Sequence, residues 1–357
     1  MASAGEPARK CMREAAEARC LRRKRSERGA LFNGLTIGYL FLGGTGGGAL
    51  TVLCSLSLVD MFRISPHAVR LSRQHGMYAW SACLLLLVLG VLCLVADMGV
   101  PERVLGFLFP REITVTLVGA WALLVGIALC MVFWCALMFD NVVLWRPLMA
   151  ALAGVGILVG LAISLYTGVL LWCMVSVLAW QTPLVALLFC LSSLSGGIAV
   201  VLAMVGFVPA RAHLMRRVEA LLRADWLIIV LELVLLAVYV AWLLLGSDTF
   251  HFGVALVVGN EAVLFWLGLV GTGLLLPLVL ERSVTYSNHR TQLLFVAASV
   301  LVGGLALRMA VVGLFPLDLS QTTEALLQAA SAATAQPLPG VEGPSGIVPA
   351  DWGPMPL

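Results

Sequence analysis

The stretch LFNGLTIGYLFLGGTGGGA, residues 31 to 49, opens the first of eight long apolar runs in this chain of 357 residues. Each run has about 20 residues or more, which is enough for a helix to cross a hydrocarbon core roughly 30 Å thick. The runs show no strand-like alternation of polar and apolar residues. They lie near residues 34–59, 77–97, 113–138, 148–172, 184–207, 224–246, 258–280 and 291–315. The sequence therefore predicts an all-α integral membrane protein with eight transmembrane helices and both termini on one side.

The composition supports this fold class. Hydrophobic residues make up 61% of the chain and charged residues 11%, with a mean hydropathy of +1.02, which excludes a soluble fold of this length. We expect membrane lipid around the chain and no nucleic acid. Three segments are predicted: a basic N-terminal tail (1–30), an eight-helix membrane domain (31–315), and a C-terminal tail rich in Ala, Pro and Gly (316–357). The nine cysteines form no Cys-x-x-Cys pair, so we expect neither an iron–sulfur cluster nor a metal site in this chain.

The distribution of basic residues predicts how the chain is oriented. We call the face with both termini the terminus side and the other face the opposite side. Ten Arg residues lie in or beside opposite-side loops, whereas only Arg103 and Arg111 lie in terminus-side loops. The positive-inside rule then places the opposite side in the cytoplasm and the termini outside it. The basic N-terminal tail argues for the reverse, but four separate loops agree with one another.

Two glycine-rich stretches hint at an internal duplication. Residues 43–49 (GGTGGGA) on the first helix have an echo in residues 193–199 (SLSGGIA) on the fifth. The eight helices are then two related four-helix bundles. Close helix packing in lipid explains the glycines at least as well as a phosphate-binding loop does. A phosphate-binding loop would follow a strand and be followed by a lysine, and neither is present here.

Charged residues inside the spans are the first functional candidates, because they are costly in a membrane. They are Asp97, Glu232, Glu261 and Arg308. Three uncharged polar residues, Asn33, Tyr166 and Asn260, are further candidates. Of these seven residues, all except Glu232 are expected in the terminus-side half of the membrane. Polar groups at that depth in apolar surroundings suit a lipid-soluble ligand with two carbonyl or hydroxyl ends, such as a quinone.

Each of these residues also has a structural interpretation. Tyr166 fits an aromatic belt at the membrane interface, and Asn33 fits a helix cap. Glu261 and Arg308 can neutralise each other, and Glu232, eight residues into its apolar run, can face another helix as a protonated acid. The five histidines are all expected in loops, so we predict no pair that ligates a membrane haem.

Four short motifs carry a resemblance to a known family. Tyr39-Leu-Phe-Leu-Gly-Gly44 resembles the opening helix of the NrfD or polysulfide-reductase membrane-subunit (PsrC-like) family. Ala96-Asp-Met-Gly-Val-Pro-Glu-Arg103 resembles the family's Leu-Asp-Leu-Gly-Arg-Pro-Glu-Arg loop. Ser164-Leu-Tyr-Thr-Gly-Val-Leu-Leu171 resembles its fourth helix, and Trp180-Gln-Thr-Pro183 its Trp-Asn-Thr-Pro segment before helix five. The resemblance covers residues 31 to 315.

The resemblance implies a subunit in a prokaryotic cytoplasmic membrane that exchanges electrons between menaquinol and a partner iron–sulfur subunit on the extracytoplasmic face. A molybdopterin or multihaem subunit of the same complex then carries the catalytic chemistry. Asn33 and Tyr166 fall where some members hold the quinone, and Asp97 falls in the loop beside it. The chain departs from the pattern at two positions: Ile37 replaces a histidine of some members, and Val100 replaces the loop arginine.

The resulting hypothesis assigns roles to the polar residues. Quinol hydroxyls lie near Tyr166 and Asn33, Asp97 or Glu261 accepts the protons, and Glu232, Glu261 and Arg308 form part of a proton path. Quinone reduction is equally compatible with these residues. Two alternatives remain open: a secondary transporter or proton-conducting subunit without quinone chemistry, and a structural anchor that has lost its quinone site.

Overall fold

The computed structural model describes the helices and several of their connections. The described residues are 6–62, 73–97, 115–138, 146–173, 177–207, 215–259, 262–282 and 289–313, and the side chains of residues 6–33 and of a few helix ends lie outside the description. The protein divides into two compact units, Met1–Phe315 and Pro316–Leu357. The second unit, which is the predicted C-terminal tail, lies wholly outside the described residues.

Within the described ranges the protein is helical apart from short turns, and no strand occurs there. The elements are α1 (Glu6–Phe62), α2 (Arg73–Asp97), α4 (Val115–Met138), α5 (Arg146–Trp172), η2 (Leu178–Trp180), α6 (Pro183–Phe207), α7 (Met215–Leu245), α8 (Phe250–Val257), η4 (Leu264–Leu275), α9 (Leu276–Arg282) and α10 (His289–Val312). Eight of the helical segments are long and apolar enough to cross a membrane. The predicted fold class is therefore confirmed, and η4 and α9 together form the seventh span.

Two of the spans differ from the apolar runs that predicted them. The sixth run starts at residue 224, but α7 begins at Met215, about two and a half turns earlier. The seventh run starts at residue 258, but its span begins at Leu264, after the separate short helix α8. The start of α7 is rich in charged residues, so hydropathy does not register it as part of the helix. The chain breaks after α8 between two apolar segments, and hydropathy does not detect such a break in the backbone.

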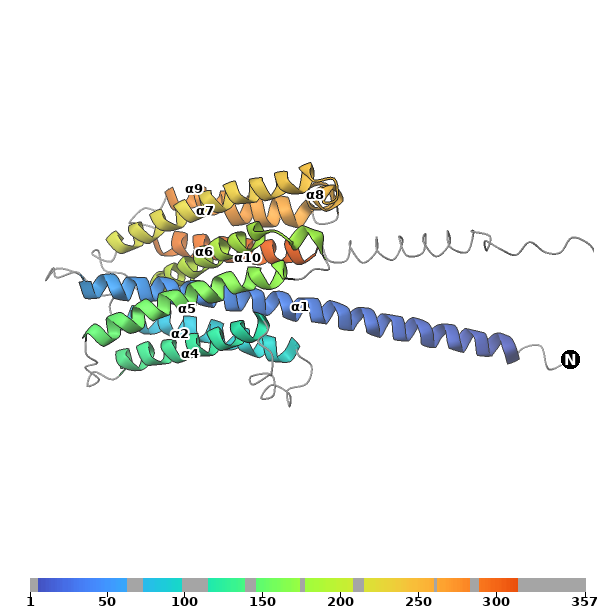
Figure 1. The fold of residues 1–357 in the computed structure, drawn as a ribbon, viewed down its shortest axis with the longest axis horizontal. Helices are drawn as coiled ribbons and strands as arrows, with labels where there is room; N and C mark the ends of the chain where they lie inside the picture. Colours follow the sequence, from blue (N-terminus) through green and yellow to red (C-terminus); the bar gives the residue numbers. More distant parts are fainter. Residues whose placement is uncertain are drawn as a thin grey trace, which may run out of the picture. The chain divides into compact units, whose positions relative to one another are not determined.

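The spans form two groups that meet along α1. The first helix group consists of α1, α2, α4 and α5, and the second of α6, α7, η4 with α9, and α10. α1 packs against α2 and α5 of its own group and against α6 of the other, while α6 also packs against α5, α7 and α10. Figure 1 shows α2 and α4 on one side of α1 and α7 to α9 on the other. The helices α1 and α6 are thus the central pair of the protein.

The two glycine-rich stretches lie at this central crossing. A Cβ atom added to Gly48 would overlap the carbonyl oxygen of Ser193, and one added to Gly197 would overlap the backbone of Gly48. Small residues let two helix backbones approach closely, which is the main packing device available in lipid. The packing interpretation of the glycines is confirmed by these contacts.

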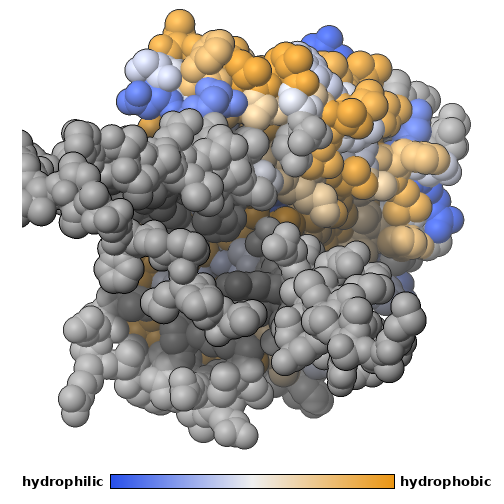
Figure 2. All heavy atoms as spheres, turned by 90° about the vertical axis from the view of Figure 1, so that its right-hand side faces the viewer, coloured by the Kyte–Doolittle hydropathy of each residue, from blue (hydrophilic) through white to orange (hydrophobic). Residues whose placement is uncertain are grey.

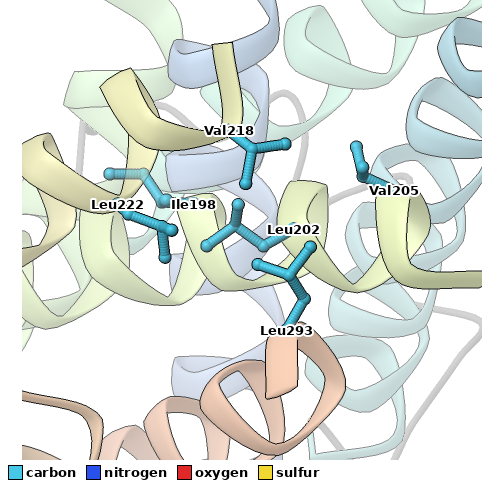
Figure 3. Close-up of a cluster of buried hydrophobic side chains, with 6 residues drawn as sticks. All are labelled: Ile198, Leu202, Val205, Val218, Leu222 and Leu293. Carbon is cyan, nitrogen blue, oxygen red and sulfur yellow. The ribbon is translucent and has the colours of Figure 1, made fainter. Parts of the chain in front are cut away.

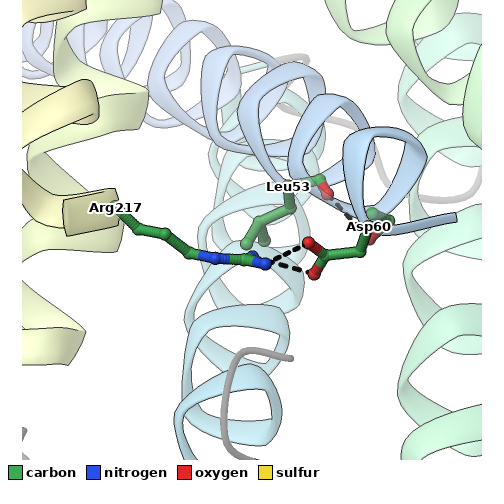
Figure 4. A network of polar contacts seen from close by, with 4 residues as sticks. Leu53, Asp60 and Arg217 are labelled. Carbon is green, nitrogen blue, oxygen red and sulfur yellow. Dashed lines mark hydrogen bonds and ion pairs between the residues drawn. The ribbon is translucent and has the colours of Figure 1, made fainter. Parts of the chain in front are cut away.

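A hydrophobic cluster closes the opposite-side end of the second helix group. Side chains from α6, α7 and α10 converge there (Figure 3), and they are Ile198, Leu202, Val205, Val218, Leu222 and Leu293. Nearby, the Arg217 guanidinium of α7 forms a two-pronged ion pair with the Asp60 carboxylate at the end of α1 (Figure 4), with one of its bonds at 2.8 Å. This ion pair ties the two helix groups together.

The outer faces of the spans are apolar. Large hydrophobic side chains that are more than half exposed include Leu92, Leu158, Leu227, Val279 and Phe295. Most of the described side chains visible from the terminus end are likewise hydrophobic, with a few hydrophilic ones between them (Figure 2). Such a surface belongs in lipid rather than in water.

The seventh span has an unusual backbone. η4 is a π-helix of 12 residues, and the buried Pro277 follows in α9. Proline has no N–H and clashes with the carbonyl four residues earlier, so a widened helix before it relieves the conflict. Gly273 of η4 and Gly303 of α10 are close enough that a Cβ on either would overlap the other's backbone. The widened helix is therefore held tightly against α10.

Candidate functional site

A carboxylate and a hydroxyl meet where α1 and α2 come together on the terminus side. The Thr36 Oγ1 of α1 lies 3.2 and 3.1 Å from the two carboxylate oxygens of Asp97 and donates a hydrogen bond to them. Asp97 is the last residue of α2 and is partly buried. The sequence pattern singled out Asp97 but did not indicate that Thr36 would hold it.

Tyr166 lies in the last two turns of α5, at the end predicted for the terminus side. Its side chain is 8% exposed, and its ring packs so closely on Gly119 of α4 that a Cβ there would overlap the ring. The Tyr166 hydroxyl has no hydrogen-bond partner among the described residues. Buried hydroxyls are nearly always paired, so this group is poised for a ligand or water. An aromatic-belt residue faces the interface instead, so burial argues against that interpretation.

Tyr39 of α1 brings these groups together. It is 6% exposed and lies within electrostatic reach of both the Tyr166 hydroxyl and the Asp97 carboxylate. We call Thr36, Tyr39, Asp97 and Tyr166 the terminus-side cluster. It unites α1, α2 and α5 of the first helix group. The sequence indicated Tyr39 only as part of a motif, although the spacing of three residues between Thr36 and Tyr39 places both on one face of α1.

Arg308 of α10 is buried beside this cluster and is bonded to three helices. Its Nε donates to the carbonyl oxygen of Leu40 on α1 at 3.1 Å, and Nη2 donates to the Ser193 hydroxyl of α6 at 2.8 Å. Nη1 donates to the carbonyl oxygen of Gly304 at 2.8 Å and to the Ser192 hydroxyl at 3.4 Å. The rings of Phe41 and Phe189 also face its guanidinium carbon, at 5.6 and 5.2 Å from their centroids.

Glu232 is the charged neighbour of Arg308. The two side chains interact electrostatically, and Glu232 is buried near the middle of α7. The expectation placed Glu232 in the half of the membrane away from Arg308. Its place near the middle of α7, which begins before its apolar run, brings it within electrostatic reach of Arg308 instead. The alternative in which Glu261 neutralises Arg308 stays a prediction, since Glu261 and Asn260 lie outside the described residues.

A small cavity adjoins Glu232. Its volume is about 10 Å³, close to the space that one water molecule needs. Ser192 and Ser195 of α6 line it together with Glu232, and residues of η4 and α10 complete it. Three polar side chains of the second helix group therefore line the same cavity.

Comparisons with known proteins bear on what these groups are for. A family model described as polysulphide reductase, NrfD, matches residues 25–314. This protein belongs to the NrfD family. It is also similar to a polysulfide reductase subunit of Wolinella succinogenes, with 34% identity over 152 residues. That match covers 42% of this protein and 48% of the relative, so it spans about half the length of the curated protein.

Membership in the NrfD family confirms the resemblance that the four motifs carried. Of the residues that the resemblance assigned, Asp97 and Tyr166 are described and lie in one cluster through Tyr39. The side chain of Asn33 and the loop residues 98–103 lie outside the description. The assignments of Asn33 and Glu261 stay predictions for this NrfD protein.

The placement of the histidines differs from the sequence prediction. His75 is buried in the first turn of α2, His251 lies in α8, and His289 begins α10, so these three are not in loops. These helices extend beyond the apolar runs, so the hydropathy pattern wrongly assigned the three histidines to loops. His75 and His251 lie at opposite ends of the bundle of this NrfD protein, so these two do not share one haem.

Proposed function

We propose that this NrfD protein is the quinol-interacting membrane subunit of a multi-subunit reductase complex. In this proposal it exchanges electrons between menaquinol and a partner iron–sulfur subunit docked on the extracytoplasmic, terminus side. A molybdopterin or multihaem subunit carries the terminal chemistry. The family membership and the similarity to a polysulfide reductase subunit support a membrane subunit of a reductase. The finer assignment rests on the geometry of the terminus-side cluster.

The observation that carries the proposal is the buried hydroxyl of Tyr166, which lacks a hydrogen-bond partner in the described part of the protein. A quinol has a hydroxyl at each end of an apolar ring, so one end accepts a hydrogen bond from Tyr166. Tyr39 interacts electrostatically with Tyr166 and Asp97, so the same cluster offers a second hydroxyl and a carboxylate. Apolar surroundings with a few convergent polar groups are typical of small-molecule sites.

The chemistry of the reaction assigns a role to each side chain. Oxidation of one quinol releases two electrons and two protons, and an iron–sulfur cluster of the partner subunit would accept the electrons one at a time. The Asp97 carboxylate accepts the two protons one after the other and passes the first to water before it takes the second, and the Thr36 hydroxyl orients that carboxylate. Tyr166 and Tyr39 position the ring. Reduction of quinone reverses each step.

The decisive experiment replaces Tyr166 by Phe in the complex purified from its native membrane. We expect the rate of oxidation of a soluble menaquinol analogue to fall roughly tenfold, which corresponds to about 1.4 kcal/mol for one lost hydrogen bond to substrate. Co-purification of an iron–sulfur protein with both variants shows that assembly is intact. Tyr78→Phe is the matched control, because Tyr78 is 56% exposed at the other end of α2. Equal oxidation rates in Tyr166→Phe and wild type would remove Tyr166 from the mechanism.

A secondary transporter or proton-conducting subunit without quinone chemistry is the second candidate. The observation that favours it is the buried pair of Glu232 and Arg308 beside the π-helical η4, because transporters gather charged groups near irregular helices at the membrane centre. The two functions are separated by binding: a fluorescent hydroxyquinoline inhibitor of quinol sites binds the complex only if a quinone site exists.

A further inference from the structure

A basic and aromatic surface lies at the opposite-side end of the second helix group, where α7 packs against α9 (Figure 1). The Arg282 guanidinium of α9 lies over the Trp226 ring of α7, with 5.1 Å from its carbon atom to the ring centroid. Arg223 comes three residues before Trp226, so these two side chains share one face of α7. We call Arg223, Trp226 and Arg282 the basic–aromatic patch. It joins the two helices that carry the sixth and seventh spans.

The patch offers hydrogen-bond donors that the described residues do not use. Arg282 is exposed, and its guanidinium forms no hydrogen bond or ion pair with another described residue. The indole attracts the positive charge without taking any of the five N–H donors of the guanidinium. The Trp226 Nε1–H also has no acceptor in the described part of the protein. Donors of this kind suit an anion with several oxygen atoms, such as a phosphate group.

The nearest carboxylates leave the patch with positive charge. Glu219 lies 3.7 Å from Arg223, but both side chains are exposed, and such a surface ion pair is weak. Asp225 and Glu281 directly precede the other two members of the patch in the chain, but successive side chains of a helix point to different faces. Both acids are buried and interact with each other rather than with the patch. Two guanidiniums therefore stand against one exposed carboxylate.

Apolar side chains continue from the patch toward the centre of the membrane on both helices. α7 enters the membrane from the opposite side and α9 ends there, so residues after Arg223 and before Arg282 lie deeper. Leu227, Leu231 and Val279 occupy such positions, one or two turns from a guanidinium, and each is more than half exposed. The surface is thus charged at the edge of the membrane and apolar directly beneath it.

We propose that the basic–aromatic patch binds an anionic phospholipid of the opposite-side leaflet. The Arg223 and Arg282 guanidiniums hold the phosphate, the Trp226 indole lies beside the glycerol ester groups, and the acyl chains follow the exposed apolar side chains beneath. Arginine and tryptophan at the edge of a membrane span are typical anchors to the interface, and basic pockets between cytoplasmic helix ends bind anionic headgroups. In the predicted orientation the opposite side faces the cytoplasm, where the leaflet has a negative surface potential.

A soluble anion and an acidic segment of a partner protein are the competing occupants. Either of them would use the two guanidiniums but would leave the exposed apolar side chains beneath without a role. The sequence of charged, aromatic and apolar groups along both helices favours a molecule that is charged at one end and apolar at the other. This proposal does not rest on the proposed function, because the lipid binds whether or not the complex reacts with quinol.

The test uses phospholipids with bromine atoms on their acyl chains, because bromine quenches the fluorescence of a neighbouring indole. The purified complex is reconstituted into phosphatidylcholine vesicles that contain increasing fractions of brominated phosphatidylglycerol. Subtracting the signal of Trp226→Phe isolates Trp226 among the ten tryptophans of the chain. We expect brominated phosphatidylglycerol to bind beside Trp226 at least tenfold more tightly than brominated phosphatidylcholine. Equal quenching by the two lipids indicates only the lipid that surrounds any membrane protein, and it would overturn the proposal.

Charge variants locate the headgroup, each measured against its own Trp226→Phe counterpart. We expect Arg282→Gln and Arg223→Gln each to reduce the preference for phosphatidylglycerol at least threefold. Arg290→Gln is the matched control: its side chain is exposed at the same end of the bundle, but its guanidinium already donates to the carbonyl oxygens of Gly206 and Phe207. If Arg282→Gln fails to assemble, Arg223→Gln carries the test, since its side chain is 77% exposed. An unchanged preference in the assembled patch variants, or an equal reduction in the control, contradicts the site.

Two salts separate the lipid from the competing occupants. Inorganic phosphate and sodium chloride are added to parallel samples at equal ionic strength. We expect both salts to weaken the binding of phosphatidylglycerol to the same extent, because both screen exposed charges alike. A larger effect of phosphate would mean that the patch recognises a soluble anion, and the lipid proposal would be wrong. Absence of Trp226 quenching by either lipid would mean that a protein segment covers the patch, which overturns the proposal as well.

Discussion

Arg308 of α10 and Leu40 of α1 are joined by a hydrogen bond of 3.1 Å from the guanidinium Nε to the backbone carbonyl oxygen. The bond crosses between the two helix groups at a point one residue from Tyr39. Because the same guanidinium also donates to Ser192, Ser193 and Gly304, one side chain fixes the relative positions of α1, α6 and α10. The terminus-side cluster and the buried pair of Arg308 and Glu232 therefore meet at a rigid joint.

Replacing Arg308 by Lys tests this joint. Lysine keeps the charge but presents one ammonium group, so it reproduces only part of the four hydrogen bonds. At roughly 0.6 kcal/mol for a hydrogen bond inside a membrane protein, we expect a loss of about 1–2 kcal/mol and a lower unfolding temperature in detergent. Arg223→Lys, at a side chain that is 77% exposed, is the control and leaves the unfolding temperature unchanged. Equal unfolding temperatures for Arg308→Lys and wild type would show that the joint does not stabilise the fold.

The central crossing of α1 and α6 gives a sharper prediction. In Gly48→Ala the new methyl group overlaps the carbonyl oxygen of Ser193, and a backbone atom cannot move aside as the end of a side chain can. We expect little or no folded subunit in the membrane, measured as the fraction that elutes as a single species in detergent. Gly154→Ala on α5 is the matched control, since nothing lies within 4 Å of its added Cβ. A normal yield of folded Gly48→Ala would mean that the two helices are farther apart than described.

The sequence predicted the eight spans because each needs a long apolar run, and hydropathy measures that property directly. It predicted the packing role of the glycines at residues 43–49 and 193–199 for a similar reason, since few other residues allow two backbones to touch. It did not predict the short helix α8 or the π-helical η4. Both lie within or beside one apolar run, and hydropathy cannot distinguish a π-helix or a separate short helix from a continuous α-helix. Pro277 was the one visible sign of irregular backbone there.

The candidate site was predicted only in part. Asp97 and Tyr166 were found because a polar residue in an apolar run is conspicuous. Two buried acids of the second helix group, Asp225 of α7 and Glu281 of α9, were missed because each lies at the edge of a run, where a charged residue usually faces water. The spacing of seven residues between Asp225 and Glu232 was the available indication, as it places both on one face of α7. Contacts between helices far apart in the sequence, such as Arg308 with Leu40, have no such local pattern.

Thr36→Val tests the role of the terminus-side cluster without removing any group that touches the quinol in the proposed mechanism. Valine has the shape of threonine but lacks the hydroxyl that donates to the Asp97 carboxylate at 3.1–3.2 Å. Hydrogen bonds to charged groups contribute about 1.5–3 kcal/mol, so a loss near the lower limit lowers the turnover rate roughly tenfold. We expect quinol-analogue oxidation to fall by this factor while inhibitor binding stays the same, because Asp97 accepts the proton rather than holding the ring. Thr51→Val is the control on the same helix, where the hydroxyl donates only to the carbonyl oxygen of Gly47 in its own helix at 2.9 Å. If both variants oxidise the analogue at the wild-type rate, Asp97 needs no orientation by Thr36, and the proton acceptor must be sought among other groups of the cluster.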